Sequence, residues 1–349
     1  MIIGVAQMEL QLSKLQYSQE EVRAKKTAAK TCLLPPNYFQ EEEMESEELM
    51  SSLPKEKGWM YSYLYKFQGF WYGAKHLQGA IKCQKQFQAQ NSDVLLITSP
   101  KSGTTWLKAI IFTLVNRTRY PVEKNHPLLN KNPHDLVPFL EANLYDNQIQ
   151  DQSSFRLFAA HVPYHSLPKT VHDSACKIIY LCRNPKDTFV SLWHFSNNLK
   201  PDKTGTNSLE DAFDLFCRGV SPCGPFWDHV LDYWKEFKEN SERILFLRYE
   251  DMKEEPGVHL RRLAQFLGCP FLAVEEETGM VEEILKLCGF DNLSKLEINR
   301  TGKLANGVEN KAFFRRGEVG DWKNLLPISM VKTIDQITEQ KFSGVGLVL

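Results

Sequence analysis

The chain of 349 residues is 42% hydrophobic and 24% charged, so it has the length and composition of a globular protein with an ordinary hydrophobic core. Its 42 basic and 43 acidic residues leave a net charge of −1, which argues against a nucleic-acid-binding protein. The eight cysteines are scattered without a C-x-x-C pair, so we expect reduced thiols in a cytoplasmic protein and no zinc site.

The N-terminal segment is expected to lie outside the folded domain. Residues 41–48 are mostly glutamate, as in a solvated tail, and the composition changes abruptly at Trp59. We therefore predict a disordered extension over residues 1–55 and one domain over residues 56–349. The start of the chain is too short and too weakly basic for a signal peptide, and no run of about 18 apolar residues occurs, so we expect no membrane association.

Eight aromatic side chains fall between residues 59 and 72. They either fill the core or form one wall of a site for an aromatic or polycyclic ligand, and different residues can do each. Apolar positions after this cluster recur at helical spacing and predict a helix over residues 75–88.

The stretch around residue 101 has the pattern of an anion-binding turn. Residues 94–97 predict a buried strand, Gly103 permits a tight turn, and residues 104–115 have helical periodicity. The first N–H groups of such a helix lack internal partners and attract anions. One cation and three hydroxyl groups accompany them: Lys101, Ser102, Thr104 and Thr105. Because Lys101 precedes Gly103, this is not the usual nucleotide-binding P-loop, and a packing role without a ligand stays open.

A histidine follows the next predicted strand. Residues 121–152 are rich in Asn and Pro and predict a long irregular connection, after which residues 155–161 predict a strand ending at His161. Side chains at the carboxyl ends of parallel strands face the ligand crevice of α/β proteins, so His161 is a candidate functional residue. Seven other histidines, among them His134, occur in polar or loop contexts and are interpreted as structural or solvent-exposed.

A second basic turn follows residues 177–182, which predict a third strand. Arg183 begins this turn, and Ser191 lies eight residues later on a predicted helix. A guanidinium fork suits a phosphate group. The alternative is that Arg183 pairs with Asp187 at the start of the helix.

The remaining elements complete an α/β pattern. Helices are predicted over residues 208–218, 225–240 and 281–290, with another that ends near Gly268, and residues 243–252 predict a fourth strand. Strands that alternate with helices indicate an α/β protein: a single domain with a central parallel sheet flanked by helices.

A third basic segment lies near the C-terminus. Arg315 and Arg316 precede Gly317, and a Gly-Asp-Trp sequence follows at residues 320–322. Two adjacent arginines beside glycines form a flexible basic clamp, although such a segment alone is more often a surface turn.

These segments resemble the motifs of one enzyme family. Residues 100–106, Pro-Lys-Ser-Gly-Thr-Thr-Trp, are similar to the 5′-phosphosulfate loop of the cytosolic sulfotransferases, a strand–loop–helix like that of P-loop kinases. Arg183 with Ser191 resembles the family's 3′-phosphate motif, and residues 314–323 resemble its C-terminal motif. The motifs occur in the family's order over residues 57–349, so the chain is identified by resemblance as a member of the plant soluble type.

The resemblance implies transfer of a sulfuryl group from 3′-phosphoadenosine 5′-phosphosulfate to a hydroxyl of a small organic acceptor, without a metal. It implies His161 as the general base and Lys101 as the cation at the leaving phosphate. Donor binding is implied for Lys101, Ser102, Gly103, Thr104, Thr105, Trp106, Arg183, Ser191, Tyr249, Phe290, Arg315, Arg316 and Gly317. Pocket positions for a flavonoid, a steroid or another phenol or alcohol are implied at Phe139, Tyr164 and Phe195.

Some positions depart from the family pattern. Ala160 replaces the usual Thr, Ala159 stands where many animal members have Lys, Gly289 replaces a Ser and Arg316 replaces a Lys. The two alanines leave open a catalytically inactive, nucleotide-binding relative. Residues 323–332 differ from the pairing motif of animal members, so we expect a monomer.

Two other classes of enzyme compete with this interpretation. A nucleotide or small-molecule kinase would share the strand–loop–helix but needs a Gly-Lys-Ser/Thr loop and a carboxylate for Mg²⁺. A membrane-anchored carbohydrate sulfotransferase is disfavoured because the sequence has no candidate anchor.

Overall fold

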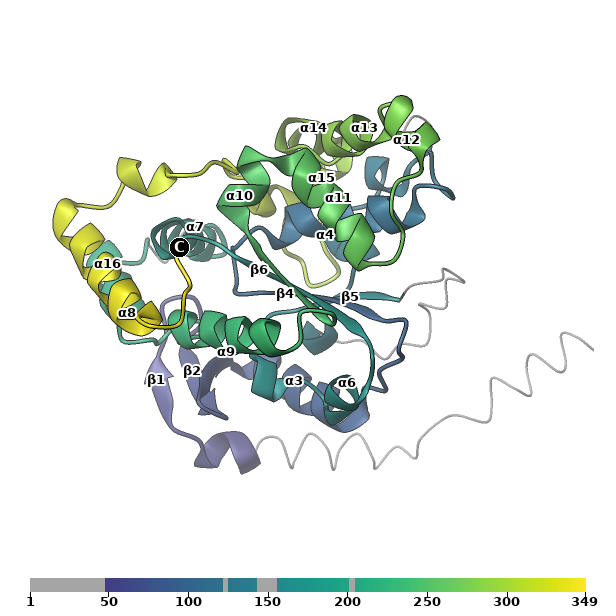
Figure 1. The fold of residues 1–349 in the computed structure, drawn as a ribbon. Helices are drawn as coiled ribbons and strands as arrows, with labels where there is room; N and C mark the ends of the chain where they lie inside the picture. The colour runs from purple at the N-terminus through teal and green to yellow at the C-terminus, as the bar shows by residue number, and fades with distance from the viewer. Residues whose placement is uncertain (1–47, 122–124, 143–155, 201–204) are drawn as a thin grey trace, which may run out of the picture. The chain divides into compact units, whose positions relative to one another are not determined.

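The structure is a computed structural model (Figure 1). It describes residues 48–121, 125–142, 156–200 and 205–349. Residues Leu53–Leu349 form one compact unit. The predicted extension over residues 1–55 lies almost entirely outside the described residues, so its disorder stays a prediction.

The centre of the domain is a parallel sheet of four strands in the order β5, β4, β6, β7. The strands are β4 (Val94–Thr98), β5 (Leu157–Ala160), β6 (Lys177–Cys182) and β7 (Ile244–Arg248). β4 pairs with β6 from Val94 opposite Lys177 to Thr98 opposite Leu181, so the carboxyl ends of the two strands meet at one edge of the sheet. The prediction of a parallel sheet flanked by helices is confirmed.

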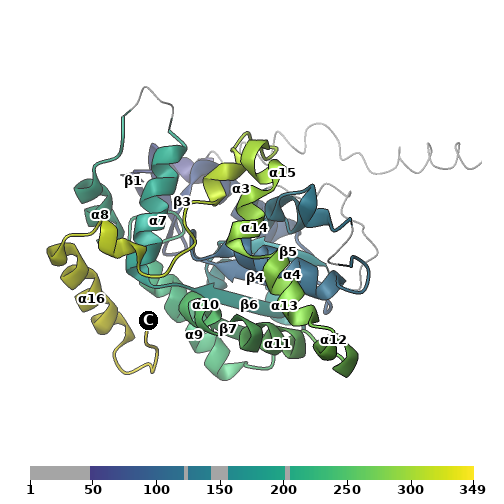
Figure 2. The same cartoon turned by 90° about the horizontal axis from the view of Figure 1, so that it is seen from above.

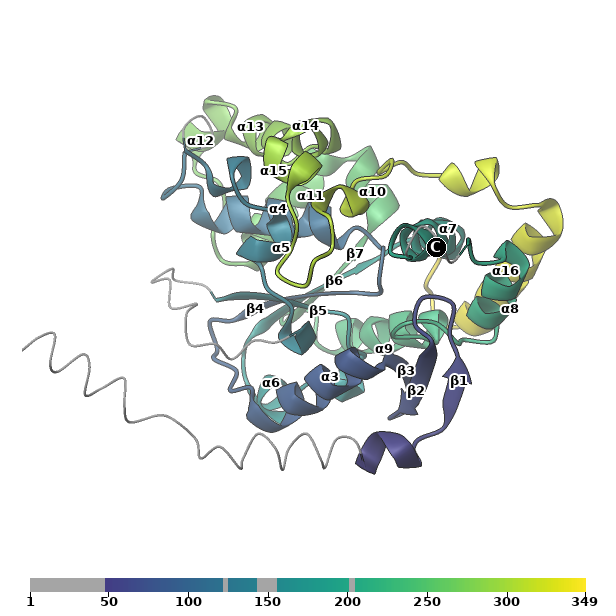
Figure 3. The same cartoon turned by 180° about the vertical axis from the view of Figure 1, so that it is seen from behind.

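Helices cover both faces of this sheet (Figures 1 and 3). One face carries α4 (Thr104–Asn116), α10 (Tyr249–Glu254), α11 (Pro256–Phe266), α12 (Ala273–Glu277), α13 (Met280–Leu287), α14 (Phe290–Lys295) and α15 (Glu297–Thr301). The other carries α3 (Ala74–Gln86), α6 (Lys169–Asp173) and α9 (Phe226–Glu239). Because both faces are covered, β4 is buried along its whole length, which is why its sequence is a continuous apolar run.

A third group of helices lies beside the sheet. It contains α7 (Pro185–Asn198), α8 (Leu209–Cys217) and α16 (Ile328–Phe342), which contact one another (Figure 2). Short helical turns join the larger elements: η1 (Pro127–Leu129), α5 (Pro133–Leu136), η2 (Leu140–Ala142), η3 (Tyr164–Ser166), η4 (Asn310–Phe313) and η5 (Asp321–Asn324). Among the residues that the structure describes, no helix has both the length and the apolar character needed to cross a bilayer.

The aromatic cluster forms an antiparallel sheet that the sequence analysis missed. Its strands are β1 (Lys55–Lys57), β2 (Tyr63–Phe67) and β3 (Phe70–Gly73). The turn between β2 and β3 places both Gln68 and Gly69 in the left-handed region, as tight hairpins require. Trp59, Phe70 and Tyr72 are buried in the core. The core interpretation therefore holds for these aromatic residues.

Two predicted elements end earlier than expected. The fourth strand, predicted over residues 243–252, stops at Arg248 because Tyr249 begins helix α10. The helix predicted over residues 281–290 is two helices, since Gly289 takes an extended conformation between α13 and α14. Phe290 is therefore the first residue of a new helix.

Candidate active site

One cavity of about 450 Å³ lies at the carboxyl ends of the four parallel strands. Each strand leads into one of its lining residues: Lys101 after β4, His161 after β5, Arg183 after β6 and Tyr249 after β7. Parallel strands place their carboxyl ends at one edge, so residues from distant parts of the sequence converge here. The predicted residues that line the cavity are Lys101, Gly103, Thr104, Thr105, Trp106, Phe139, His161, Arg183, Ser191, Phe195, Tyr249, Phe290, Arg315, Arg316 and Gly317.

The turn after β4 is shaped by two left-handed residues, Lys101 at φ 70° and Gly103 at φ 110°. A Cβ atom on Gly103 would lie 2.7 Å from the Cδ2 atom of Tyr249, so only glycine fits. Helix α4 then begins at Thr104, with its amino end at the cavity. The Ser102 hydroxyl is buried 2.9 Å from that of Ser99, and the residue is not among those lining the cavity, so its donor-binding role stays a prediction.

Lys101 belongs to a group of cations at one end of the cavity, which we call the basic end: Lys101, Arg183, Arg315 and Arg316. The Nζ atom of Lys101 lies 4.0 Å from the ring centroid of Phe195. Burial, and then the charges of Arg183 and Arg315, lower the pKa of Lys101 to about 7. An anion bound here would oppose this shift by favouring the ammonium form.

Arg183 is buried, and its shorter contact is with the backbone and not with Asp187, the partner in the alternative interpretation. Its Nη2 atom donates to the Glu318 carbonyl oxygen at 2.6 Å, while Asp187 is 3.7 Å away. The Asp187 carboxylate instead accepts the N–H groups of Gly320 (2.7 Å) and Trp322 (3.0 Å). Asp187 therefore fastens the C-terminal basic segment to α7, and a simple Arg183–Asp187 pair does not describe this turn.

The C-terminal arginines share one acidic partner. Arg315 and Arg316 pair with the two carboxylate oxygens of Asp321 at 2.5 and 2.7 Å. The Nε atoms of Arg183 and Arg315 are buried and have no hydrogen-bond partner within the described residues. Buried donors of this kind are normally paired, so these two N–H groups suit a bound anion.

Aromatic rings stand beside the basic end. Trp106 and Tyr249 meet edge to face with their centroids 5.5 Å apart, and the Tyr249 hydroxyl donates to the Gly317 carbonyl oxygen at 2.8 Å. Phe290 lies against Gly317, where a Cβ atom would come within 2.7 Å of its ring. These rings provide apolar surfaces that suit a planar base.

A second group of lining residues, which we call the histidine end, contains His134, Phe139, Glu141 and His161. The Nδ1 atom of His161 lies 2.8 Å from the Thr98 carbonyl oxygen. A carbonyl only accepts, so Nδ1 carries the proton and Nε2 keeps a free lone pair. Burial lowers the pKa of His161 to about 3, which keeps the imidazole neutral.

Glu141, which precedes His161 by 20 residues, contacts the backbone of this histidine. Its Oε1 atom accepts the His161 backbone N–H at 2.6 Å. Burial raises the pKa of Glu141 to about 7. The histidine that follows β5 is thus fixed through both its ring and its backbone.

One predicted pocket residue lies elsewhere, and several lining residues were missed. Tyr164 is buried against His172 and Tyr233, with centroid distances of 4.7 and 5.6 Å, and does not line the cavity. Its position one turn beyond β5 directs it into the core. The missed lining residues include His76, His134, Glu141, Cys223 and Phe313, whereas Tyr61 belongs to the aromatic cluster for which a site wall was one of the two interpretations.

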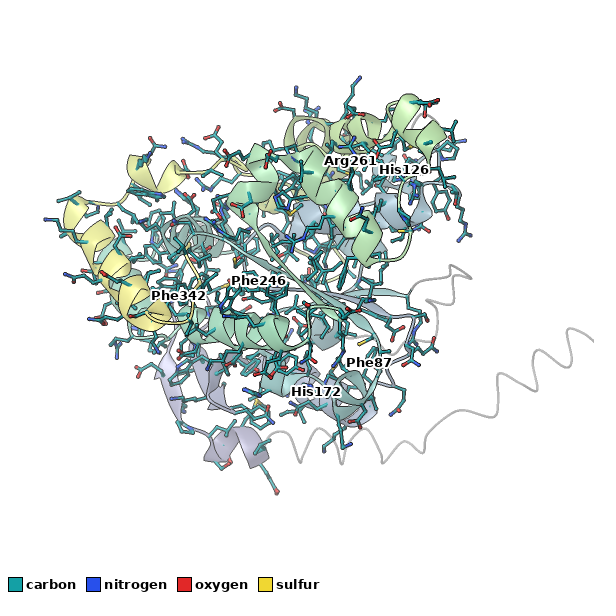
Figure 4. The ribbon with its side chains drawn as sticks, in the orientation of Figure 1. Phe87, His126, His172, Phe246, Arg261 and Phe342 are labelled. Atoms are coloured by element: carbon teal, nitrogen blue, oxygen red, sulfur yellow. The ribbon has the colours of Figure 1, made fainter. Side chains whose placement is uncertain are left out.

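The histidines divide into those in the cavity and those outside it. His126 packs against Phe112 and Tyr120, and His172 packs against Tyr164. Figure 4 labels His126 and His172, which lie far apart in the domain. His134 also occurs in a polar, loop-like sequence context, so the sequence analysis interprets it as structural or solvent-exposed. No local signal shows that this residue faces inward.

Comparisons with known proteins agree with this geometry. The family model described as the sulfotransferase domain matches residues 91–346. The protein named cytosolic sulfotransferase 12 of Arabidopsis thaliana is 50% identical over 319 residues, which cover 89% of this chain and 97% of that protein. Cytosolic sulfotransferase 15 of the same plant is 49% identical, covering 87% and 86%.

Solved structures show the same likeness. A crystal structure of an Arabidopsis thaliana sulphotransferase has a TM-score of 0.68 and 45% identity, covering 86% of this chain and 94% of that one. A mouse sulfotransferase crystallised with PAP has a TM-score of 0.62 and 27% identity, covering 80% and 94%.

Proposed function

Because the chain belongs to the sulfotransferase family, we propose that it transfers a sulfuryl group from 3′-phosphoadenosine 5′-phosphosulfate to a hydroxyl group of a small organic acceptor. The observation that carries this donor is the pair of buried Nε atoms on Arg183 and Arg315, which have no partner within the described ranges. The mouse relative crystallised with PAP supports the same choice.

The basic end fits the two phosphates of this donor. Lys101 and the amino end of α4 would hold the 5′-phosphosulfate, since backbone N–H groups and a lysine suit an anion. The remaining cations and neighbouring groups would hold the 3′-phosphate: Arg183, Ser191, Arg315, Arg316 and Gly317. Trp106, Tyr249 and Phe290 would surround the adenine.

His161 would act as the general base. Its Nε2 atom would take the proton of the acceptor hydroxyl while the acceptor oxygen forms a bond to sulfur and the bond from sulfur to the bridging phosphate oxygen breaks. Lys101 would stabilise the negative charge that grows on that leaving phosphate. The carbonyl of Thr98 maintains the tautomer that this role requires.

The lining of the cavity supports a flat aromatic or polycyclic acceptor. Phe139, Phe195 and Phe313 present rings to it, and Tyr61 adds a phenol from the aromatic cluster. These surfaces suit a flavonoid, a steroid or another phenol or alcohol. The names of the cytosolic relatives support a cytoplasmic enzyme, and a monomeric state stays a prediction from the sequence.

Ligand-dependent unfolding tests the donor. Adenosine 3′,5′-bisphosphate without metal should raise the melting temperature by several degrees, because a ligand at 100 times its Kd adds about 2.7 kcal/mol of stability. ATP with Mg²⁺ at the same concentration should give a smaller shift. Stabilisation by ATP with Mg²⁺ alone would favour the kinase alternative. Incubation with the sulfated donor and a panel of phenols and sterols should then give a sulfated product, whereas binding without product would favour an inactive relative.

A further inference from the structure

A second buried histidine lines the cavity and has hydrogen-bond partners on both ring nitrogens. His134 lies on α5, where its Nε2 atom is 2.9 Å from the Thr105 hydroxyl and its Nδ1 atom is 3.1 Å from Lys108 Nζ. Its ring lies 5.4 Å from Phe139 and 4.3 Å from Phe313, measured between centroids. Unlike His161, this residue has no free nitrogen with which to take a proton.

The donor assigned at one ring nitrogen of His134 fixes which ring nitrogen carries the proton. Lys108 is completely buried, and we assign its amine as the donor in the 3.1 Å contact with His134 Nδ1, which makes Nδ1 the acceptor. The other ring nitrogen then carries the hydrogen and donates to the Thr105 oxygen. Because the Thr105 oxygen already accepts this bond, its own hydroxyl hydrogen is left to donate elsewhere. Thr105 lines the cavity, so that hydrogen is available to a ligand oxygen.

The neighbouring threonine is connected differently. The hydroxyl of Thr104 lies 2.7 Å from that of Thr98, which is itself 3.1 Å from Nδ1 of His161. Thr104 is buried, whereas Thr105 is partly open. The two threonines at the start of α4 are thus linked to two different histidines, and Thr105 is the more accessible of the two to a bound donor.

His134 is itself held by a buried set of amides. Its backbone N–H donates to Asn132 Oδ1 at 2.9 Å, and Asn132 Nδ2 donates to Asn299 Oδ1 at 2.8 Å. Asn299 in turn donates to the Leu293 carbonyl oxygen at 2.8 Å. Asn132 and Asn299 are buried, so the histidine is positioned before any ligand enters.

We propose that His134 is a positioning residue for sulfuryl transfer: oriented by Lys108, it directs the hydroxyl hydrogen of Thr105 toward an oxygen of the transferring sulfuryl group. This inference rests on the proposed function, since it needs a donor at the amino end of α4. Its consequence is a hydrogen bond that strengthens as charge develops during transfer, so it affects kcat more than donor affinity.

A double-mutant cycle tests the link between the two side chains. Thr105→Val removes the hydroxyl and keeps the shape, and His134→Phe keeps a ring between Phe139 and Phe313 but removes both hydrogen bonds. Each variant should lower kcat roughly tenfold, the effect of one hydrogen bond. Affinity for adenosine 3′,5′-bisphosphate should stay within about twofold. The double variant should be no slower than the worse single variant, because both remove the same interaction.

Two further variants separate positioning from packing. His134→Gln keeps an N–H donor for Thr105 and should retain kcat within roughly threefold of the wild type. Lys108→Met keeps the buried volume but removes the hydrogen bond to His134 Nδ1, so it should lower kcat. In the Thr105→Val background the same substitution should have no further effect on kcat. This second cycle also replaces the first if His134→Phe does not fold.

The outcomes distinguish the two proposals. Losses that multiply to roughly a hundredfold in the double variant, or a His134→Phe enzyme as fast as the wild type, would overturn the positioning role while leaving the proposed function intact. A wild-type chain that binds no bisphosphate and makes no sulfated product would overturn the proposed function and this inference together.

Discussion

At the basic end of the cavity the arginines carry permanent charge, whereas at the histidine end burial favours the neutral forms of His161 and Glu141. Arg315 and Arg316 carry permanent charge beside Asp321. Burial keeps His161 in its neutral form and raises the pKa of Glu141 to about 7. The difference suggests a division of work. Charge attracts and holds an anionic donor, while hydrogen-bond direction at the other end determines which atom can accept or give a proton.

Removal of the proposed base should separate the two ends most clearly. His161→Ala should lower kcat by about 10²- to 10⁴-fold, the usual contribution of a general base, because no other nitrogen at this position can take the acceptor proton. Adenosine 3′,5′-bisphosphate affinity should stay near the wild-type value, as measured by calorimetric titration. His165→Ala, which removes an exposed histidine, is the control. A large loss of donor affinity in His161→Ala would mean that the ends do not act separately.

Glu141 offers a test of the buried, neutral character of the histidine end. Its folded-state pKa of about 7 lies above the ordinary value of 4.5. As the pH rises, the unfolded chain therefore loses its proton first, and stability is lost between pH 4.5 and about 7. Glu141→Gln avoids this loss and keeps an oxygen for the His161 N–H. Its free energy of unfolding relative to wild type should rise by about 3 kcal/mol between pH 4.5 and 8.

Urea unfolding followed by tryptophan fluorescence at several pH values measures this difference. Glu276→Gln is the matched control, because hydrogen bonds from Arg261 lower the pKa of that exposed carboxyl and the difference should change in the opposite direction. A Glu141→Gln difference that is constant with pH would show that Glu141 is ionised in the folded protein.

Arg183 tests the charged end. Arg183→Ala should weaken bisphosphate binding by about 1.5–3 kcal/mol, the range for hydrogen bonds to charged groups, which is roughly 10- to 150-fold in Kd. At saturating donor, kcat should fall much less. Arg218→Ala removes an exposed arginine that pairs with Asp214 and serves as the control. Equal donor affinity in the two variants would remove Arg183 from the anion site.

The basic end was largely predictable from sequence because its residues lie next to local signals. Arg183 immediately follows a buried strand, Lys101 lies three residues after the end of another, and Arg315 lies close to two glycines. The parallel sheet then brings these places together. Ser102 shows the limit of such reasoning: its position in the turn is right, yet the left-handed residues on either side turn its hydroxyl toward Ser99.

At the histidine end, His161 and Phe139 were predicted from the sequence, whereas His134 and Glu141 were not, since long-range packing decides which side chains face inward. His134 and Glu141 lie in an irregular connection without periodicity, and Tyr61 comes from a hairpin that an aromatic-rich sequence does not distinguish from core packing. Lys108 occurs within the apolar helix α4, is buried, and contacts a histidine 26 residues away in sequence. Tyr164, a predicted pocket residue, is instead buried outside the lining of the cavity, and long-range packing decides this as well.

The smallest expected effect concerns Arg316, where this chain departs from the family's lysine. Its side chain is 50% exposed and pairs with Asp321, so solvent screens it more than the buried Arg183. Arg316→Ala should weaken bisphosphate binding by about 0.5–1 kcal/mol, a two- to fivefold change in Kd that diminishes as salt is added. Arg316→Lys keeps the charge and should bind as the wild type does. If Arg316→Ala weakened bisphosphate binding as much as Arg183→Ala does, burial would not determine how much each arginine contributes to donor affinity. The proposed difference between exposed and buried cations in the cavity would then be wrong.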